Sequence, residues 1–267
     1  MRGFLTLAVS LSALFFTGTA AYPTDPVDLE TRGNIAKRSL PKLVHFDNNN
    51  PDDRKKNLKI RQAFRDSLQL MDYSVQQLQD NVFKQYFNEG DKSKVQDVFK
   101  KALGGDPGRG ASELGDFYIT NIDVNNKCGD NTLLGYTGKD DKGNQIIHFC
   151  ERLYSKPLIK DVKCESLQDT VGAGMAVMGA TLLHEFMHAD AIGKVSLGKA
   201  IIDVDNGYGP LQTRNLKDGD KLVNADNYTW LATENLWSII CQKSYSAPRD
   251  ERDTSDPDCD DKTCTVQ

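Results

Sequence analysis

Several features that define large classes of proteins are missing from this sequence. Only four of its 267 residues are histidines. After the first twenty or so residues, no apolar run is long enough to span a bilayer, and no internal repeat is visible. The net charge of −5 gives no basic surface for nucleic acid or an anionic membrane. We therefore expect neither a nucleic-acid partner nor a membrane partner.

Cysteine is also sparse, and the spacing of the cysteines argues against a structural metal site. No two cysteines form a C-x-x-C pair, so a structural zinc bound by cysteines is not expected. An even number of cysteines in an exported chain instead predicts disulfides, here three, with the pairing left open. The six residues are Cys128, Cys150, Cys164, Cys241, Cys259 and Cys264.

The first residues have the pattern of a targeting segment. Arg2 is followed by a short apolar run and then by small residues, so residues 1–21 are predicted to be a signal peptide of a secreted, extracellular protein. The dibasic pair Lys37-Arg38 predicts a propeptide over residues 22–38. We expect one domain over residues 39–244 and a polar tail over residues 245–267. Asn227 begins an N-glycosylation sequon whose use stays open.

Hydrophobic periodicity predicts a mostly helical α+β domain. Apolar residues recur at helical spacing in four segments, and short strand-like runs interrupt them in the middle of the chain. We expect the strands to form a small antiparallel sheet. The predicted helices cover residues 52–83, 92–103, 166–193 and 224–241, and the predicted strands lie within residues 117–122, 133–136 and 146–150.

The third predicted helix carries the sequence His184-Glu185-Phe186-Met187-His188. Residues four apart lie on the same helix face, so both histidines can bind one metal ion. Glu185 is placed to accept a proton from water that the ion activates. The pattern predicts a catalytic zinc site, in which Glu185 is the general base.

A catalytic zinc ion needs a third protein ligand. A histidine six residues after His188 is excluded, because Lys194 stands there. The residue types leave an acidic ligand, and several positions remain open. The candidates are Asp190, Asp203, Asp205, Asp226 and Glu234.

Residues 203–209, Asp-Val-Asp-Asn-Gly-Tyr-Gly, resemble a motif of a known family. They are similar to the Gly-Thr-x-Asp-x-x-Tyr-Gly motif of the deuterolysin-like metallopeptidases, the aspzincins, which include lysine-specific metalloendopeptidases. The resemblance implies a zincin-like fold with Asp205 as the third zinc ligand. It also implies that the Tyr208 hydroxyl lies near the substrate carbonyl. Ile202-Asp203 replaces the family's Gly-Thr, which leaves Asp203 as a competing ligand.

The sequence thus predicts a secreted zinc metalloendopeptidase that acts as a monomer on protein or peptide substrates. One Zn²⁺ per chain would be bound by His184, His188 and Asp205, with Glu185 and Tyr208 as catalytic residues. The alternatives are a secreted zinc-binding protein of the same fold without peptidase activity, and a protein that binds no metal. Asp190 and Asp226 are candidate acceptors for the outer imidazole N–H groups, and His45 and His148 are expected to be structural or surface residues.

Overall fold

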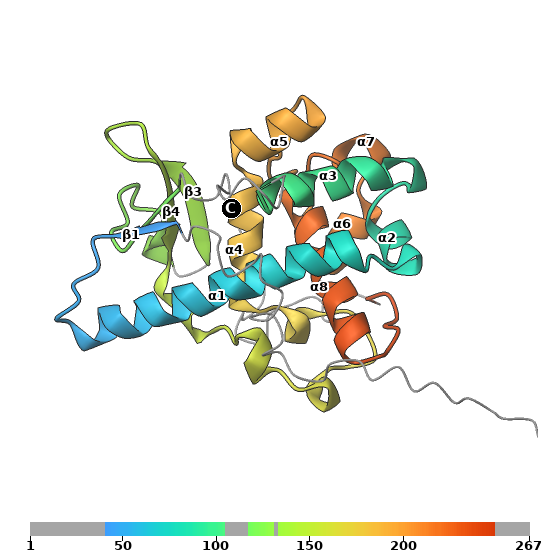
Figure 1. Cartoon of the computed structure of the whole chain (residues 1–267), viewed down its shortest axis with the longest axis horizontal. Helices are drawn as coiled ribbons and strands as arrows, with labels where there is room; N and C mark the ends of the chain where they lie inside the picture. The colour runs from blue at the N-terminus through green and yellow to red at the C-terminus, as the bar shows by residue number, and fades with distance from the viewer. Residues whose placement is uncertain (1–40, 105–116, 131–132, 249–267) are drawn as a thin grey trace, which may run out of the picture.

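The computed structural model describes residues 41–104, 117–130 and 133–248 (Figure 1). The predicted signal peptide and propeptide, most of the predicted tail, and Cys259 and Cys264 lie outside these residues. The described part is mostly helical with a small mixed sheet. In Figure 1 the sheet lies at one side of the molecule and most of the helices at the other, with α4 between them.

The four-stranded sheet has the order β1-β2-β4-β3. Its strands are β1 (Lys42–Val44), β2 (Tyr118–Thr120), β3 (Gly135–Lys139) and β4 (Gln145–Phe149). β1 pairs with β2 and β2 with β4 in parallel, and only β3 is antiparallel to its neighbour β4. The predicted antiparallel sheet is therefore wrong in its pairing, because an unpredicted strand from the start of the domain joins it. β3 is left as an edge strand.

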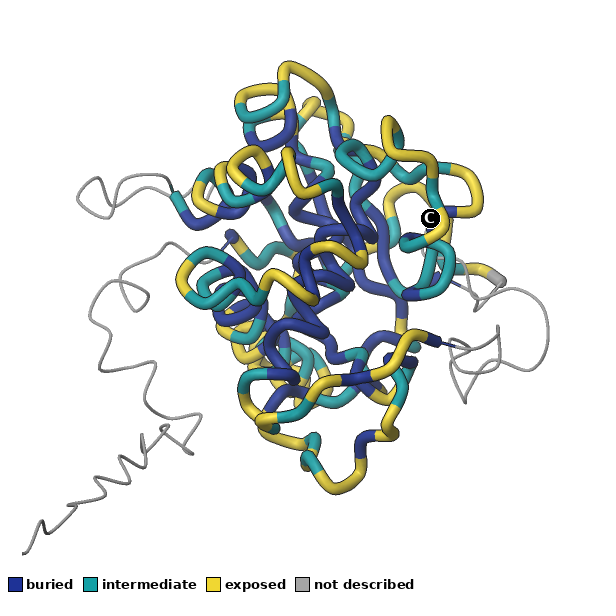
Figure 2. Tube along the Cα trace, turned by 90° about the vertical axis from the view of Figure 1, so that its right-hand side faces the viewer, coloured by how far each residue is buried: buried dark blue, intermediate teal, exposed yellow. Residues whose placement is uncertain are grey.

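The helices are longest at the two ends of the described chain. They are α1 (Pro51–Gln76), α2 (Asp80–Tyr86), α3 (Lys92–Ala102), α4 (Met178–Met187), α5 (Asp190–Leu197), α6 (Gly209–Asn215), α7 (Asp218–Lys221) and α8 (Ala225–Ile240). α1 packs against α4 and α8, and their contacts form the centre of the hydrophobic core. Figure 2 shows these buried segments gathered in the middle of the molecule.

The helix predicted over residues 52–83 is interrupted after Gln76. α1 begins as its sequence dictates, with Asn50 accepting a hydrogen bond from the Asp52 N–H and Pro51 at the first position. At the break, the side chain of Asn235 on α8 accepts from the Gln79 N–H at 2.9 Å and donates to the Tyr73 carbonyl at 3.3 Å. A buried amide from a distant helix thus satisfies backbone groups on both sides of the break.

The helix predicted over residues 166–193 is also shorter than expected. Residues 166–177 form 3₁₀ turns and extended segments, and Val177 precedes the first turn of α4. Val171 donates its N–H to the Ser246 carbonyl at 3.0 Å, so part of this segment pairs with the chain after α8. α4 ends at Met187 with His188 as its C-cap, and Ala189 in an extended conformation separates it from α5. The predicted helices over residues 92–103 and 224–241 are confirmed.

Two disulfides join described residues, Cys128–Cys150 and Cys164–Cys241. Among the described residues, no helix combines the length and apolar character needed to cross a membrane. Asn227, which begins the glycosylation sequon, is 0% exposed. Its amide nitrogen donates to the carbonyls of Tyr86 and Thr213 at 2.8 and 3.0 Å, so the folded chain offers no nitrogen there for a glycan.

Candidate metal centre

α4 brings the two histidines of the predicted motif together. His184 lies one helical turn before His188, and their Nε2 atoms are 3.3 Å apart. His184 is 1% exposed. This helix is held against the core because Gly179 allows it to approach α1 closely: a Cβ at that position would lie 2.5 Å from the Cβ of Asp66.

The outer nitrogen of each histidine ring has its own partner. Nδ1 of His184 is 2.9 Å from Oδ1 of Asp226, the second residue of α8. Nδ1 of His188 is 3.2 Å from the carbonyl oxygen of Ile201. A carbonyl oxygen only accepts hydrogen bonds, so Nδ1 of His188 is the donor in this contact, and Nε2 is the ring nitrogen that faces His184. Partners of this kind fix ring orientation in metal sites. The role expected for Asp226 thus agrees with its position.

Asp203 completes the group. Its carboxylate oxygens lie 3.0 Å from Nε2 of His184 and 3.3 Å from Nε2 of His188. One ligand atom from each of these three residues lies within 4.8 Å of the others. Two imidazoles and one carboxylate are a donor set found in catalytic zinc sites, which leave one coordination position open.

Asp205, the third ligand implied by the family motif, does not join this group. The Ile202 N–H donates to the Val223 carbonyl at 2.7 Å, and the Ala225 N–H donates to the Ile202 carbonyl at 2.9 Å. This pairing holds Asp203 beside the histidines. The chain then turns, with the Gly207 N–H bonded to the Val204 carbonyl at 2.8 Å, and Asp205 is exposed within that turn. The structure therefore brings together His184, His188 and the competing candidate, Asp203.

The electrostatics of the group favour a cation. Burial disfavours a charged imidazole, but the carboxylates of Asp203 and Asp226 outweigh it and raise the pKa of His184 well above its usual value. Burial likewise opposes ionisation of Asp203, yet the two histidines hold its pKa well below the usual range. The Asp203 carboxylate beside the two ring nitrogens therefore favours a positive charge at this position, which a proton on His184 or a bound cation would supply. A divalent metal ion fits this preference and the donor set.

Glu185 points to the same region from the next position on α4. It is 1% exposed, and burial is the main cause that raises the pKa of its carboxyl group. Thr137 on β3 donates its hydroxyl to Oε2 of Glu185 at 2.8 Å. Oε1 of Glu185 is buried and has no hydrogen-bond partner among the described residues. This oxygen is free to accept a proton.

Tyr208 lies on the other side of His184. The centres of the two rings are 6.2 Å apart. Burial, followed by the neighbouring Asp203 carboxylate, raises the pKa of the Tyr208 hydroxyl far above its usual value, so the hydroxyl stays a proton donor. The Gly209 N–H that follows donates to Oδ2 of Asp226 at 2.7 Å. Asp226 therefore connects His184 to the loop that carries Tyr208.

A cleft of about 460 Å³ opens beside these residues. Glu185, His188 and Asp203 line it. One wall is the edge strand β3, from Thr137 to Lys139, and another is the segment from Ala200 to Ile202. The candidate catalytic groups are therefore accessible from a groove that runs along a sheet edge.

Other residues considered from sequence have structural roles. Glu234 is buried in an ion pair with Arg214 and accepts a hydrogen bond from the Tyr86 hydroxyl. Asp190 forms an exposed ion pair with Lys194 at 2.7 Å. Neither belongs to the group formed by the two histidines and Asp203.

The two remaining histidines are both near Thr120. Nδ1 of His45 is 3.0 Å from its hydroxyl, and Nδ1 of His148 is 2.9 Å from its carbonyl. His148 also lies close to Asp123 and Cys128. Cys128 is in a disulfide and has no thiolate to offer, so this second cluster does not have the donors of a metal site.

Comparison with known proteins gives distant structural similarity and no sequence match. No family model matches the chain, and no curated protein matches it. Among solved structures, it is similar to a zinc peptidase from Grifola frondosa, with a TM-score of 0.45 and 16% identity, over 70% of this chain and 98% of that chain. The function of this chain is therefore argued from its own residues.

Proposed function

We propose that this protein is a zinc metallopeptidase with His184, His188 and Asp203 as metal ligands. The observation that carries the proposal is the convergence of two imidazole nitrogens and a carboxylate beside a buried glutamate. Asp203 replaces Asp205 in the ligand set expected from the family motif, because it is the carboxylate within 3.0 and 3.3 Å of the histidines.

The side chains divide the chemistry between them. A bound zinc ion would polarise the peptide carbonyl and make water more acidic. Glu185, held by Thr137 through one oxygen, accepts the proton from water with the other. Tyr208 stays protonated and donates a hydrogen bond to the carbonyl oxygen as negative charge develops on it. Burial raises the pKa of both groups, which makes the Glu185 carboxylate a stronger base and keeps the Tyr208 hydroxyl a donor.

The edge strand supports a peptide as the substrate class. Within the described part of the chain, β3 pairs with β4 alone, so the backbone of its other side can pair with an added extended chain. Thr137 and Gly138 on this strand line the cleft next to Glu185. A peptide that lies along β3 brings its carbonyls to the catalytic residues. The two disulfides also suit an oxidising compartment, and we propose that the protein acts outside the cell.

Metal content tests the ligand set. We expect one zinc ion per chain by elemental analysis. Asp203→Ala should lose the metal, whereas Asp205→Ala, altered at an exposed position two residues away, should keep it. The opposite result would restore the ligand implied by the family motif. A chain that binds no zinc would contradict the proposal as a whole.

Catalysis is tested separately with Glu185→Gln, which keeps the size of the side chain. We expect chelator-sensitive cleavage of denatured casein by the unmodified chain and a loss of about 100-fold or more in the variant, with zinc retained. Full activity of Glu185→Gln would remove this residue from the mechanism. Zinc binding without cleavage would favour the alternative, a zinc-binding protein, although such a protein has no need of a buried glutamate with a free oxygen.

A further inference from the structure

Two lysines line the cleft together with its acidic residues. Lys127 and Lys139 both contribute to its wall. Neither has an ion-pair partner within the described part of the chain. The remaining acidic wall residue outside the metal group, Asp190, is already paired with Lys194 at 2.7 Å. The cleft therefore has two unneutralised positive charges beside the catalytic residues.

The acidic residues of the metal centre do not neutralise the charges of Lys127 and Lys139. Glu185 and Asp203 are the carboxylates of the centre that line the cleft, and a divalent ion bound there balances both charges. Asp140, on the β3–β4 turn, does not line the cleft, and its carboxylate accepts hydrogen bonds from the backbone N–H groups of Lys142 and Asn144. The remaining charges that face a substrate, those of Lys127 and Lys139, are positive.

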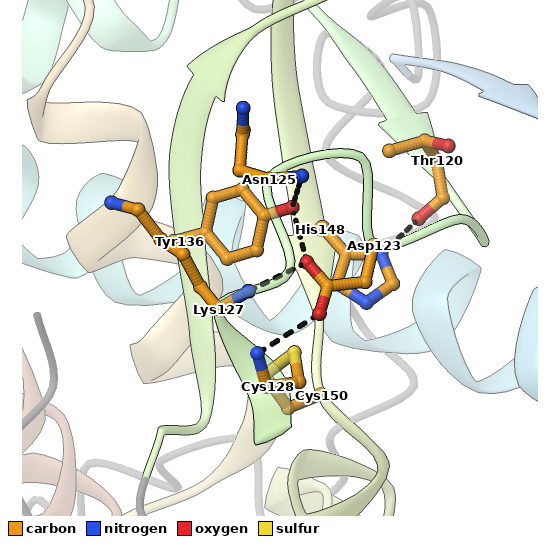
Figure 3. The surroundings of a disulfide bond; sticks show 8 residues. All are labelled: Thr120, Asp123, Asn125, Lys127, Cys128, Tyr136, His148 and Cys150. Carbon is orange, nitrogen blue, oxygen red and sulfur yellow. Dashed lines mark hydrogen bonds between the residues drawn. A yellow bond between two sulfur atoms is a disulfide. The ribbon is translucent and has the colours of Figure 1, made fainter. Parts of the chain in front are cut away.

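Lys127 is held in place by the loop that carries it (Figure 3). Asp123 accepts the Lys127 N–H at 3.0 Å and the Cys128 N–H at 2.9 Å, and it also accepts the Tyr136 hydroxyl at 2.7 Å. The Cys128–Cys150 disulfide ties the same loop to the residue that follows β4. The Lys127 ammonium group lies 5.3 Å from the centre of the Tyr136 ring.

The loop also packs directly on the edge strand. A Cβ at Gly138 would lie 2.8 Å from Oδ1 of Asn125, so the loop contacts β3 at this glycine. Lys139 is the next residue of the strand. The loop and the strand thus present their lysines to one groove from fixed backbones, which lowers the entropy lost when a charged partner binds.

We propose that this cleft selects peptides with an aspartate or glutamate side chain close to the scissile bond, and that Lys127 and Lys139 recognise it. This inference rests on the proposed peptidase function. A cleft with these charges disfavours a lysine side chain at the same position. It therefore opposes the lysine preference of some members of the family that the sequence resembles.

The test compares peptides that differ only in having Glu, Gln or Lys near the scissile bond. We expect kcat/KM to fall in that order, by about fivefold from Glu to Gln, and the difference to shrink at high ionic strength. The Lys127→Glu/Lys139→Glu double variant should reverse the order. Lys142→Glu, on the same hairpin but outside the cleft wall, should keep the original order.

Binding gives a result that does not depend on turnover. Fluorescence anisotropy with the zinc-loaded Glu185→Gln variant should show tighter binding of the Glu peptide than of the Lys peptide, and adding Lys127→Glu and Lys139→Glu should reverse the difference. Equal binding or equal kcat/KM of the two peptides would overturn the inference. If the unmodified chain cleaves casein but does not prefer the Glu peptide, the inference alone is refuted. If the unmodified chain cleaves no substrate, the peptidase function is refuted, and the binding comparison then tests the inference by itself.

Discussion

Asp226 forms hydrogen bonds with two separate parts of the metal centre. One of its carboxylate oxygens is bonded to His184 and the other to the Gly209 N–H beside Tyr208. We expect Asp226→Asn to weaken zinc binding by about 10- to 100-fold, because the amide supports the donor nitrogen of His184 less well. Competition with a chromophoric chelator measures this affinity. Asp190→Asn, at the exposed ion pair, is the control and should leave it unchanged; equal losses in both variants would contradict the role of Asp226.

Asp66 gives the protein a pH-dependent stability. Burial, partly offset by the hydrogen bond from the Ile159 N–H at 2.9 Å, raises the pKa of this carboxyl group to about 6 from 3.8. The folded state therefore binds more protons than the unfolded state between these values, and stability is lost as the pH rises through them.

Replacing Asp66 by Asn removes this cost while keeping an acceptor for Ile159. We expect Asp66→Asn to raise the free energy of unfolding at pH 7 by up to about 3 kcal/mol, with the difference disappearing toward pH 4. Urea denaturation across this pH range measures it. If the gain in the free energy of unfolding from Asp66→Asn grew as the pH fell, burial of the ionised carboxylate would not be the cause of the gain.

The sequence predicted the histidine pair and Glu185 correctly as neighbours, because helix geometry fixes the spacing within one turn. The sequence did not identify Asp203 as the third metal ligand. The position of that carboxylate depends on the pairing of Ile202 with residues near Asn224, which lies beyond the motif. Thr137 was missed because it lies 48 residues before Glu185 and has no local pattern of its own.

At the scale of the elements, the contact between α1 and α4 depends on one glycine. A Cβ at Gly179 would lie 2.9 Å from the Ala63 carbonyl oxygen and 3.0 Å from the Ser67 nitrogen, both backbone atoms of α1. We expect Gly179→Ala to force the helices apart and to cost about 1–3 kcal/mol of stability. Gly174→Ala provides the control, because a Cβ at Gly174 would meet no described atom within 4 Å. Thermal unfolding should show a lower Tm for Gly179→Ala alone; equal shifts would exclude crowding as the cause.

Helix positions could be predicted where one face of the helix is apolar, as in α3 and α8. The ends of α1 and α4 could not be predicted, since contacts from elsewhere set them. Asn235 occupies the break after α1, and Ser246 pairs with the segment that precedes α4. Neither partner is visible in the local sequence. β1 was missed for the same reason, because its parallel partner lies far along the chain.

At the scale of the whole molecule, the Cys164–Cys241 disulfide joins the end of α8 to the segment before α4. It closes a separation of 77 residues, and we expect its removal to cost about 4 kcal/mol through the entropy of the unfolded chain. The double variant Cys164→Ser/Cys241→Ser avoids an unpaired thiol. Urea denaturation should show a larger loss than for Cys128→Ser/Cys150→Ser, whose separation is 22 residues; the reverse order would argue against an entropic origin.

The packing of α1 on α8 also determines when the chain can fold during its synthesis. α1 is the first helix of the described chain and α8 the last, and α4 reaches its place only between them. Until the ribosome has released the residues of α8, α1 can pack against α3 and α4 but lacks the part of the core that α8 contributes. The core is therefore complete only once α8 has been synthesised, an order of events compatible with a polypeptide that is translocated before it folds.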